Sequence, residues 1–98
     1  MRLPTHRAPT TPGEILLEEW LKPMKLTQLA LAKKMGVDVQ LVNGIINGRR
    51  SVTAKTALLL AKVLKTSPEF WLNAQMAMDL WQAQSELKDE RVSRRKSA

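Results

Sequence analysis

The chain has 98 residues, which is the size of one domain, a net charge of +7 and no cysteine. The lack of cysteine excludes disulfide bonds and thiolate metal sites, and it fits a cytoplasmic protein. The longest apolar run, residues 57–61, is too short to span a bilayer, and the N-terminus has no apolar segment typical of a secretory signal.

The positive charge is concentrated in the middle of the chain. Residues 22–65 carry nine basic side chains and one acid, while the two flanks are close to neutral. A block this one-sided favours a polyanion as partner. A solubilising surface is the alternative. A membrane-binding face is disfavoured, because the basic residues do not share one amphipathic helix.

The N-terminal residues predict a flexible arm followed by a helix. Residues 1–12 hold three prolines and should form an extended arm. Pro12-Gly13 indicates a turn, with Pro12 or Thr11 near the entry of the helix. The next residues, GEILLEEWLK, predict a helix that Pro23 stops. Its buried face should contain Ile15, Leu16 and Trp20, with Leu21 as a further candidate. Its three glutamates could suggest acid–base chemistry, but a solvated face that complements the helix dipole is the better interpretation.

Two short helices joined by a glycine turn follow. Thr27 should cap a helix that ends at Gly36, and Asp38 should cap a second helix that Asn47 and Gly48 end. The inward positions of the two helices are Leu31, Ala32, Met35, Val42 and Ile45. This layout is typical of a helix-turn-helix, whose second helix can enter the major groove of DNA.

The outward side of the second helix has the chemistry of base recognition. Gln40 and Asn43 can each make two hydrogen bonds to adenine, and Val39 can touch a thymine methyl group. Gly44 would leave room for close approach to DNA. The alternative is that both amides are ordinary solvated surface residues.

The surrounding residues suit phosphate. Thr27 and Gln28 begin a helix whose N-terminal N–H groups can bind an anion, and Arg49 and Arg50 could clamp the DNA backbone. Diffuse attraction would come from Lys33, Lys34 and Lys55. Each of these residues alone does not indicate DNA binding, since Thr27 could be only a cap and basic pairs are common on surfaces. Their fixed order supports the DNA-binding interpretation.

Two further helices complete the predicted all-α fold of five helices. Thr53 or Ser51 should begin the fourth, with Leu58, Ala61 and Leu64 facing inward. Ser67 and Pro68 should begin the fifth. The apolar residues of the fifth helix form two stripes: Phe70, Ala74, Ala77 and Trp81, and Leu72, Met76 and Leu80.

These two stripes make an apolar face too wide for one side of a small bundle. Either the core wraps the fifth helix or a partner covers part of it. The apolar pattern fades after residue 86, so the domain should span residues 13–86 and residues 87–98 should form a frayed basic tail.

Nothing in the sequence indicates catalysis. His6 is the only histidine and lies in the proline-rich arm, which disfavours a metal site. Nucleophile-elbow, dinucleotide-binding and phosphate-loop motifs are absent from the sequence. We therefore expect no enzymatic activity, no metal and no cofactor.

Two sets of motifs resemble known proteins. TQLALAKKMGV and VNGIINGRRSVTAKTALLLAKVL resemble the lambda-repressor-like (XRE) helix-turn-helix domain. PGEILLEEWLKPMKLT, SPEFWLNAQ and DLW resemble the HigA antitoxins of HigBA toxin–antitoxin modules, so the likeness covers roughly residues 10–83. The resemblance implies a homodimer that binds a palindromic DNA operator and represses its own operon. It also implies a HigB-type toxin as partner, a RelE-like ribonuclease that cleaves mRNA.

The resemblance also assigns positions. The family's DNA-facing sites match Thr27, Gln28, Val39, Gln40, Asn43, Arg49 and Arg50. The fifth helix matches the segment that pairs two subunits, with Phe70, Trp71, Ala74, Met78 and Trp81 as interface candidates. Thr11, Asp38 and Met78 depart from the histidine, serine and tyrosine that the family often has there.

A toxin that binds RNA is expected to be basic, so the acidic edge of the first helix is a candidate toxin contact. It consists of Glu14, Glu18 and Glu19. Two other functions stay open: a stand-alone phage-type repressor without a toxin, and a protein-binding adaptor that acts through the fifth helix.

Overall fold

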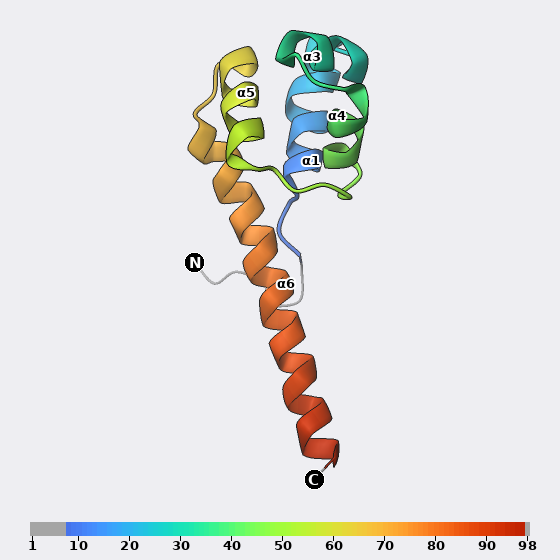
Figure 1. Cartoon of the computed structure of the whole chain (residues 1–98), viewed down its shortest axis with the longest axis vertical. Helices are drawn as coiled ribbons and strands as arrows, with labels where there is room; N and C mark the ends of the chain where they lie inside the picture. Colours follow the sequence, from blue (N-terminus) through green and yellow to red (C-terminus); the bar gives the residue numbers. More distant parts are fainter. Residues whose placement is uncertain (1–7, 98) are drawn as a thin grey trace.

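The computed structural model describes the backbone of residues 8–97 and the side chains of residues 8–89. Residues 1–7 of the predicted arm lie outside the described residues. Within the described range the chain is all-α, and the prediction of five helices is confirmed. Four of them pack into a head from which the fifth projects, giving extents of 55 × 31 × 20 Å (Figure 1).

The first helix is continuous over residues 12–24 and consists of α1 (Pro12–Ile15), the π-helical turn η1 (Leu16–Leu21) and α2 (Lys22–Met24). Thr11 is its N-cap, because its Oγ1 accepts a hydrogen bond from the Glu14 N–H at 3.1 Å. The helix ends at Lys25, which adopts a left-handed conformation with φ of 53°.

The prediction that Pro23 stops this helix is wrong, because the helix includes Pro23 and ends after Met24. In a regular α-helix the proline ring would clash with the carbonyl four residues earlier. The preceding turn is π-helical, and the Lys22 N–H bonds to the carbonyl of Leu17, five residues back. This wider turn accommodates the proline.

The central pair consists of α3 (Gln28–Met35) and α4 (Val39–Ile46). Thr27 caps α3 and Asp38 caps α4, each through a side-chain oxygen that accepts a backbone N–H, as predicted. Gly36 and Gly48 have φ of 72° and 80°, the left-handed region in which glycine avoids the strain of a Cβ atom.

Helix α5 (Ala54–Leu64) begins at the N-cap Thr53. Its inward face consists of Thr56, Ala57, Leu60 and Leu64. The prediction that Leu58 faces inward is wrong, since its side chain is 61% exposed. Three consecutive leucines fit several helical registers, and packing against the head selects the one that buries Leu60.

Helix α6 (Pro68–Ser97) begins at Ser67, whose hydroxyl oxygen accepts the Phe70 N–H at 3.1 Å. It continues past residue 86, where the apolar pattern led us to expect a frayed tail. Residues 86–96 are rich in leucine, lysine, glutamate and arginine, which are good helix formers. Intrinsic propensity therefore accounts for the extension beyond the packed head.

The core lies where all five helices meet. Its buried apolar residues are Leu16, Leu21, Leu31, Ala32, Met35, Val42, Ile45, Val52, Ala57, Leu60, Leu64 and Trp71. Trp71 is fully buried, and its indole N–H donates to Thr66 Oγ1 at 2.7 Å. Trp20 and Phe70 pack on it at centroid distances of 5.2 and 5.0 Å. Among the described residues, no helix combines the length and apolarity needed to cross a membrane.

Candidate nucleic-acid interface

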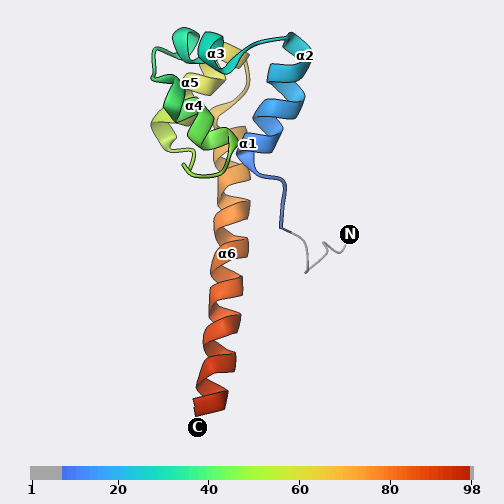
Figure 2. The same ribbon diagram turned by 90° about the vertical axis from the view of Figure 1, so that its right-hand side faces the viewer.

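Helices α3 and α4 pack against each other across a three-residue turn at one end of the head (Figure 2). Val42 and Ile45 anchor α4 in the core. The helical period therefore turns a different set of positions outward: Val39, Gln40, Asn43 and Asn47. Gln40 and Asn43 are exposed and Val39 is half-buried, so the predicted base-reading residues share one outward face.

A row of hydrogen-bonded amides lines this face. Asn43 Nδ2 donates to Gln28 Oε1 at 3.1 Å, which joins α4 to the start of α3. Asn47 Nδ2 donates to Asn43 Oδ1 at 3.0 Å, and Asn47 Oδ1 accepts the Arg49 N–H at 3.2 Å. The row fixes which edge of the Asn43 amide faces outward, since amide oxygens only accept and amide nitrogens only donate.

Asn47 was not predicted as a member of this row, because its place in the sequence indicates only the end of the helix. The signal was present in the spacing. Asn47 lies four residues after Asn43, which places the two on the same helical face.

The expected role of Gly44 is wrong. This glycine is buried and does not lie on the outward face. A Cβ atom at Gly44 would stand 2.9 Å from Cγ and 3.0 Å from Cδ of Arg50. Gly44 therefore makes room for the Arg50 side chain, which packs along the flank of α4.

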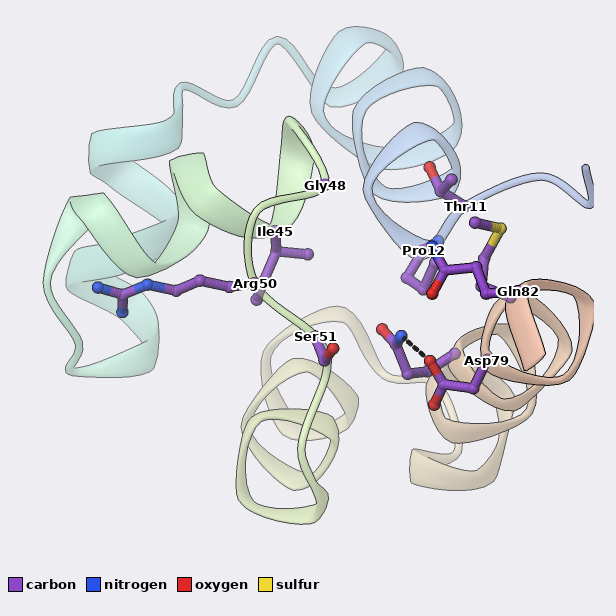
Figure 3. Close-up of a pocket in the computed structure, with 10 residues that line it drawn as sticks. Thr11, Pro12, Ile45, Gly48, Arg50, Ser51, Asp79 and Gln82 are labelled. Atoms are coloured by element: carbon purple, nitrogen blue, oxygen red, sulfur yellow. Dashed lines mark hydrogen bonds between the residues drawn. The ribbon is translucent and has the colours of Figure 1, made fainter. Parts of the chain in front are cut away.

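The two arginines follow α4 on a loop that is tied to the helix. The backbone N–H groups of Arg49 and Arg50 both donate to the carbonyl of Gly44, at 2.8 and 3.0 Å. Both side chains are exposed. Figure 3 shows the Arg50 side chain extending away from the neighbouring pocket. The structure thus brings the predicted arginines to the end of the helix that carries Gln40 and Asn43.

The remaining predicted phosphate contacts are all accessible. Thr27 is exposed, and its hydroxyl can still donate while its oxygen caps α3. Gln28 is half-buried because it bonds to Asn43. Three lysines on α3 and α5 are exposed: Lys33, Lys34 and Lys55. Diffuse attraction needs no defined contact, so their exposure is sufficient for that role.

Helix α4 is also supported from behind by α1. The prediction that Pro12-Gly13 marks a turn is wrong, because both residues lie inside α1 and are buried, whereas the prediction that the helix begins near Thr11 or Pro12 is confirmed. A Cβ atom at Gly13 would stand 2.1 Å from the carbonyl oxygen of Ile45 and 2.6 Å from that of Ile46. Gly13 thus permits the two helices to touch backbone to backbone.

A pocket of about 100 Å³ lies where the start of α1, the loop after α4 and helix α6 meet (Figure 3). Thr11 lines it at the start of α1, Ile45 and Ser51 line it from α4 and the loop that follows, and Gln75 and Asp79 line it from α6. It is too small for a drug-sized ligand. Among the described residues, no cluster of histidine and acids could hold a metal ion.

The dimer candidates on α6 differ in accessibility. Phe70 is exposed, while Ala74, Met78 and Trp81 are half-buried. Trp71 is fully buried within its own subunit, so its side chain has no surface to offer a partner, and its assignment to the interface is wrong. The two apolar stripes predicted for this helix did not show which side of α6 packs against the core.

Other parts of α6 stay apolar and exposed. Met76 and Leu80 are each 57% exposed, and Leu87 is 58% exposed. On α1 and η1, the toxin-contact candidates Glu14, Glu18 and Glu19 are exposed. Glu18 accepts a hydrogen bond from Lys22 Nζ at 2.8 Å, an exposed pair that contributes little to stability.

Two helices joined at a glycine turn, an outward row of amides and two following arginines define a helix-turn-helix protein. The helix-turn-helix family model matches residues 17–71 of this chain. The chain therefore belongs to the XRE-type helix-turn-helix family, whose members are non-enzymatic regulators.

Within this family the chain is similar to named antitoxins and regulators. It is 45% identical to antitoxin HigA-1 of Vibrio cholerae over 86 residues, which cover 88% of this chain and 81% of the relative. It is 43% identical to the uncharacterized HTH-type transcriptional regulator YbaQ of Escherichia coli, over 86% of this chain and 74% of that protein. The solved structure of antitoxin GraA in complex with its operator is 43% identical, with a TM-score of 0.79 and coverage of 94% and 93%.

Proposed function

We propose that this chain is a HigA-type antitoxin that binds a DNA operator through α4. The observation that carries the proposal is the outward amide row on α4, which is bordered by two arginines. Gln40 and Asn43 would read base edges in the major groove, and Arg49 and Arg50 would contact phosphates. The likeness to an operator-bound antitoxin over nearly the whole chain supports this assignment.

The finer parts of the proposal concern assembly. The chain acts as a homodimer on a palindromic operator and represses its own operon. The two copies of α4 would then lie about 34 Å apart, one turn of DNA. The half-exposed stripe of α6, with Phe70, Ala74, Met78 and Trp81, would pair the subunits, and its partial exposure in the single chain supports this role.

The second partner is a HigB-type toxin, a RelE-like ribonuclease that cleaves mRNA and that this chain neutralises. The contact surface would include Glu14, Glu18 and Glu19, because exposed acids suit a basic RNA-binding enzyme. Reversing the charges of Glu18 and Glu19 to lysine should weaken toxin binding. If toxin affinity is unchanged, this surface is wrong, and the antitoxin proposal itself still stands.

The deciding experiment is co-expression of the tagged chain with its adjacent open reading frame, followed by a pull-down and a growth assay. A small basic protein that co-purifies, and that is toxic without this chain, would support the antitoxin function. A harmless neighbour that does not co-purify would favour a stand-alone repressor.

Footprinting on the DNA upstream of the gene tests the operator. Each phosphate that the protein neutralises should add about −0.9 to the slope of log K against log salt concentration. A protein-binding adaptor that uses only the exposed apolar residues of α6 would give no footprint and little salt dependence.

A further inference from the structure

The loop between α4 and α5, residues 47–53, carries both arginines. Its first half is fixed by α4, since the N–H groups of Arg49 and Arg50 donate to the Gly44 carbonyl. The Gly48 N–H also donates to the Ile45 carbonyl at 3.2 Å. This half of the loop therefore follows the end of the recognition helix.

The second half of the loop is fixed by a residue far away in sequence. The Val52 N–H donates to Oε1 of Gln75 on α6 at 2.8 Å, across 23 residues. Val52 is buried and Gln75 is half-buried, so water does not readily replace this acceptor.

Asp79 sets the orientation of the Gln75 amide. Gln75 Nε2 donates to Asp79 Oδ1 at 3.0 Å, one helical turn along α6, which is the dashed line in Figure 3. A carboxylate only accepts hydrogen bonds, so the nitrogen of the amide must face Asp79. The oxygen then faces the Val52 N–H.

We propose that Gln75 is a positioning residue for DNA binding, which acts through the Val52 backbone to place Arg49 and Arg50. The proposal rests on the proposed operator-binding function. Without an acceptor, the buried Val52 N–H is left unpaired, and the loop must shift to hydrate it. The shift moves the two arginines away from the phosphates, although Gln75 itself contacts no DNA.

The test uses Gln75→Met, which keeps the length of the side chain and removes the acceptor. Operator affinity of the full chain should fall about tenfold, the size of one lost charge-assisted hydrogen bond. The salt slope should become flatter by about one phosphate contact. Gln84→Met is the matched control, because Gln84 is exposed on the same helix and does not line the pocket. This control should bind operator like the parent chain.

A polarity swap provides the rescue. Gln75→Glu combined with Asp79→Asn keeps an acceptor for the Val52 N–H and reverses donor and acceptor between the two α6 residues. The net charge of the protein is unchanged, so its long-range attraction to DNA is preserved. Affinity should return to within about twofold of the parent. A pair that binds as weakly as Gln75→Met would overturn the proposal.

A double-mutant cycle separates positioning from general damage to the fold. In a chain that already carries Arg49→Ala and Arg50→Ala, Gln75→Met should have no further effect on affinity. A further tenfold loss there would show that Gln75 acts without the arginines, and the proposal would fail. If the parent chain lacks salt-dependent operator binding, the proposed function fails instead, which is a separate result.

Asp79→Ala serves if Gln75→Met does not fold, because Asp79 is exposed and lies outside the core. Losing a negative charge would by itself strengthen DNA binding. Weaker DNA binding by Asp79→Ala would therefore indicate that Asp79 orients Gln75 and would support the proposal. Unchanged or stronger binding would contradict the proposal.

Discussion

The side-chain amide of Asn43 donates to Oε1 of Gln28 over 3.1 Å and so joins the two helices of the helix-turn-helix through their polar faces. Gln28 thereby holds the amide whose free edge would read a base. A residue first assigned to phosphate contact has a second role, which is to orient its neighbour.

We predict that Gln28→Ala relaxes the base preference at the operator position that Asn43 reads. Asn43→Ala should lose about 1–3 kcal/mol of discrimination at that position. The double variant should be no worse than Asn43→Ala alone, because the two residues act as one unit. The base preference of each variant is measured by its affinity for operators with single base changes. Gln40→Ala is the control, and its effect on binding should add to that of Gln28→Ala. If the effects of Gln28→Ala and Asn43→Ala were also fully additive, Gln28 would not orient Asn43.

We predict that Gly13→Ala destabilises the fold strongly. The new Cβ would collide with the backbone carbonyl of Ile45, which has no freedom to move aside, and overpacking of this kind costs about 1–3 kcal/mol or more. Urea unfolding gives the change in the free energy of unfolding. Gly44→Ala is the matched control, since the three atoms nearest to the same methyl group there all belong to the side chain of Arg50.

The control should lose less stability than Gly13→Ala, because side-chain atoms of Arg50 can shift more easily than a backbone carbonyl, and alanine is favoured over glycine in a helix by up to about 1 kcal/mol. If both variants lose the same stability, the contact between α1 and α4 is not what demands glycine at position 13.

We predict that Thr66→Val destabilises the head by about 1–3 kcal/mol, the cost of a buried donor left unpaired. The indole N–H of the fully buried Trp71 has Thr66 Oγ1 as its acceptor, and valine has nearly the same shape without the oxygen. Thermal and urea unfolding measure the loss. Thr66→Ser keeps the acceptor and should retain most of the stability of the parent chain. An equal loss in both variants would show that the hydrogen bond to Trp71 does not account for the effect of Thr66→Val.

We predict that Ala77→Lys dissociates the dimer. Ala77 is exposed and follows Ala74 on the stripe assigned to subunit pairing, so a lysine there would place an unpaired charge in the interface. Sedimentation velocity measures the oligomeric state, and circular dichroism checks that the fold survives. Leu80→Lys tests the other stripe of α6 and should leave the dimer intact. If Leu80→Lys dissociates the dimer and Ala77→Lys does not, the interface lies on the side of α6 that carries Met76 and Leu80.

Local signals predicted most of the fold. Thr27, Asp38 and Ser67 were identified as caps because a side-chain oxygen before an apolar periodic run has one preferred use. Gly36 and Gly48 were recognised because each follows the last periodic residue of a helix. These features depend on neighbours within four residues, which the sequence displays directly.

The features that were missed depend on distant parts of the chain. Gly13 is required by the backbone of α4, more than thirty residues later, and Gln75 finds its partner 23 residues back. Pro23 was misread because its tolerance depends on an unusual turn before it. The buried face of Trp71 could be assigned only when the side of α6 that meets the head was known.

The contact with Gly13 has a consequence for how the chain can change its target. Helix α4 is fixed by its rear surface: the backbone meets α1, while Val42 and Ile45 enter the core. Val39 also packs against the core, whereas the Gln40 side chain is exposed and lies outside it. The side chain at position 40 can therefore be replaced, and the DNA preference changed, without disturbing the packing that holds α4.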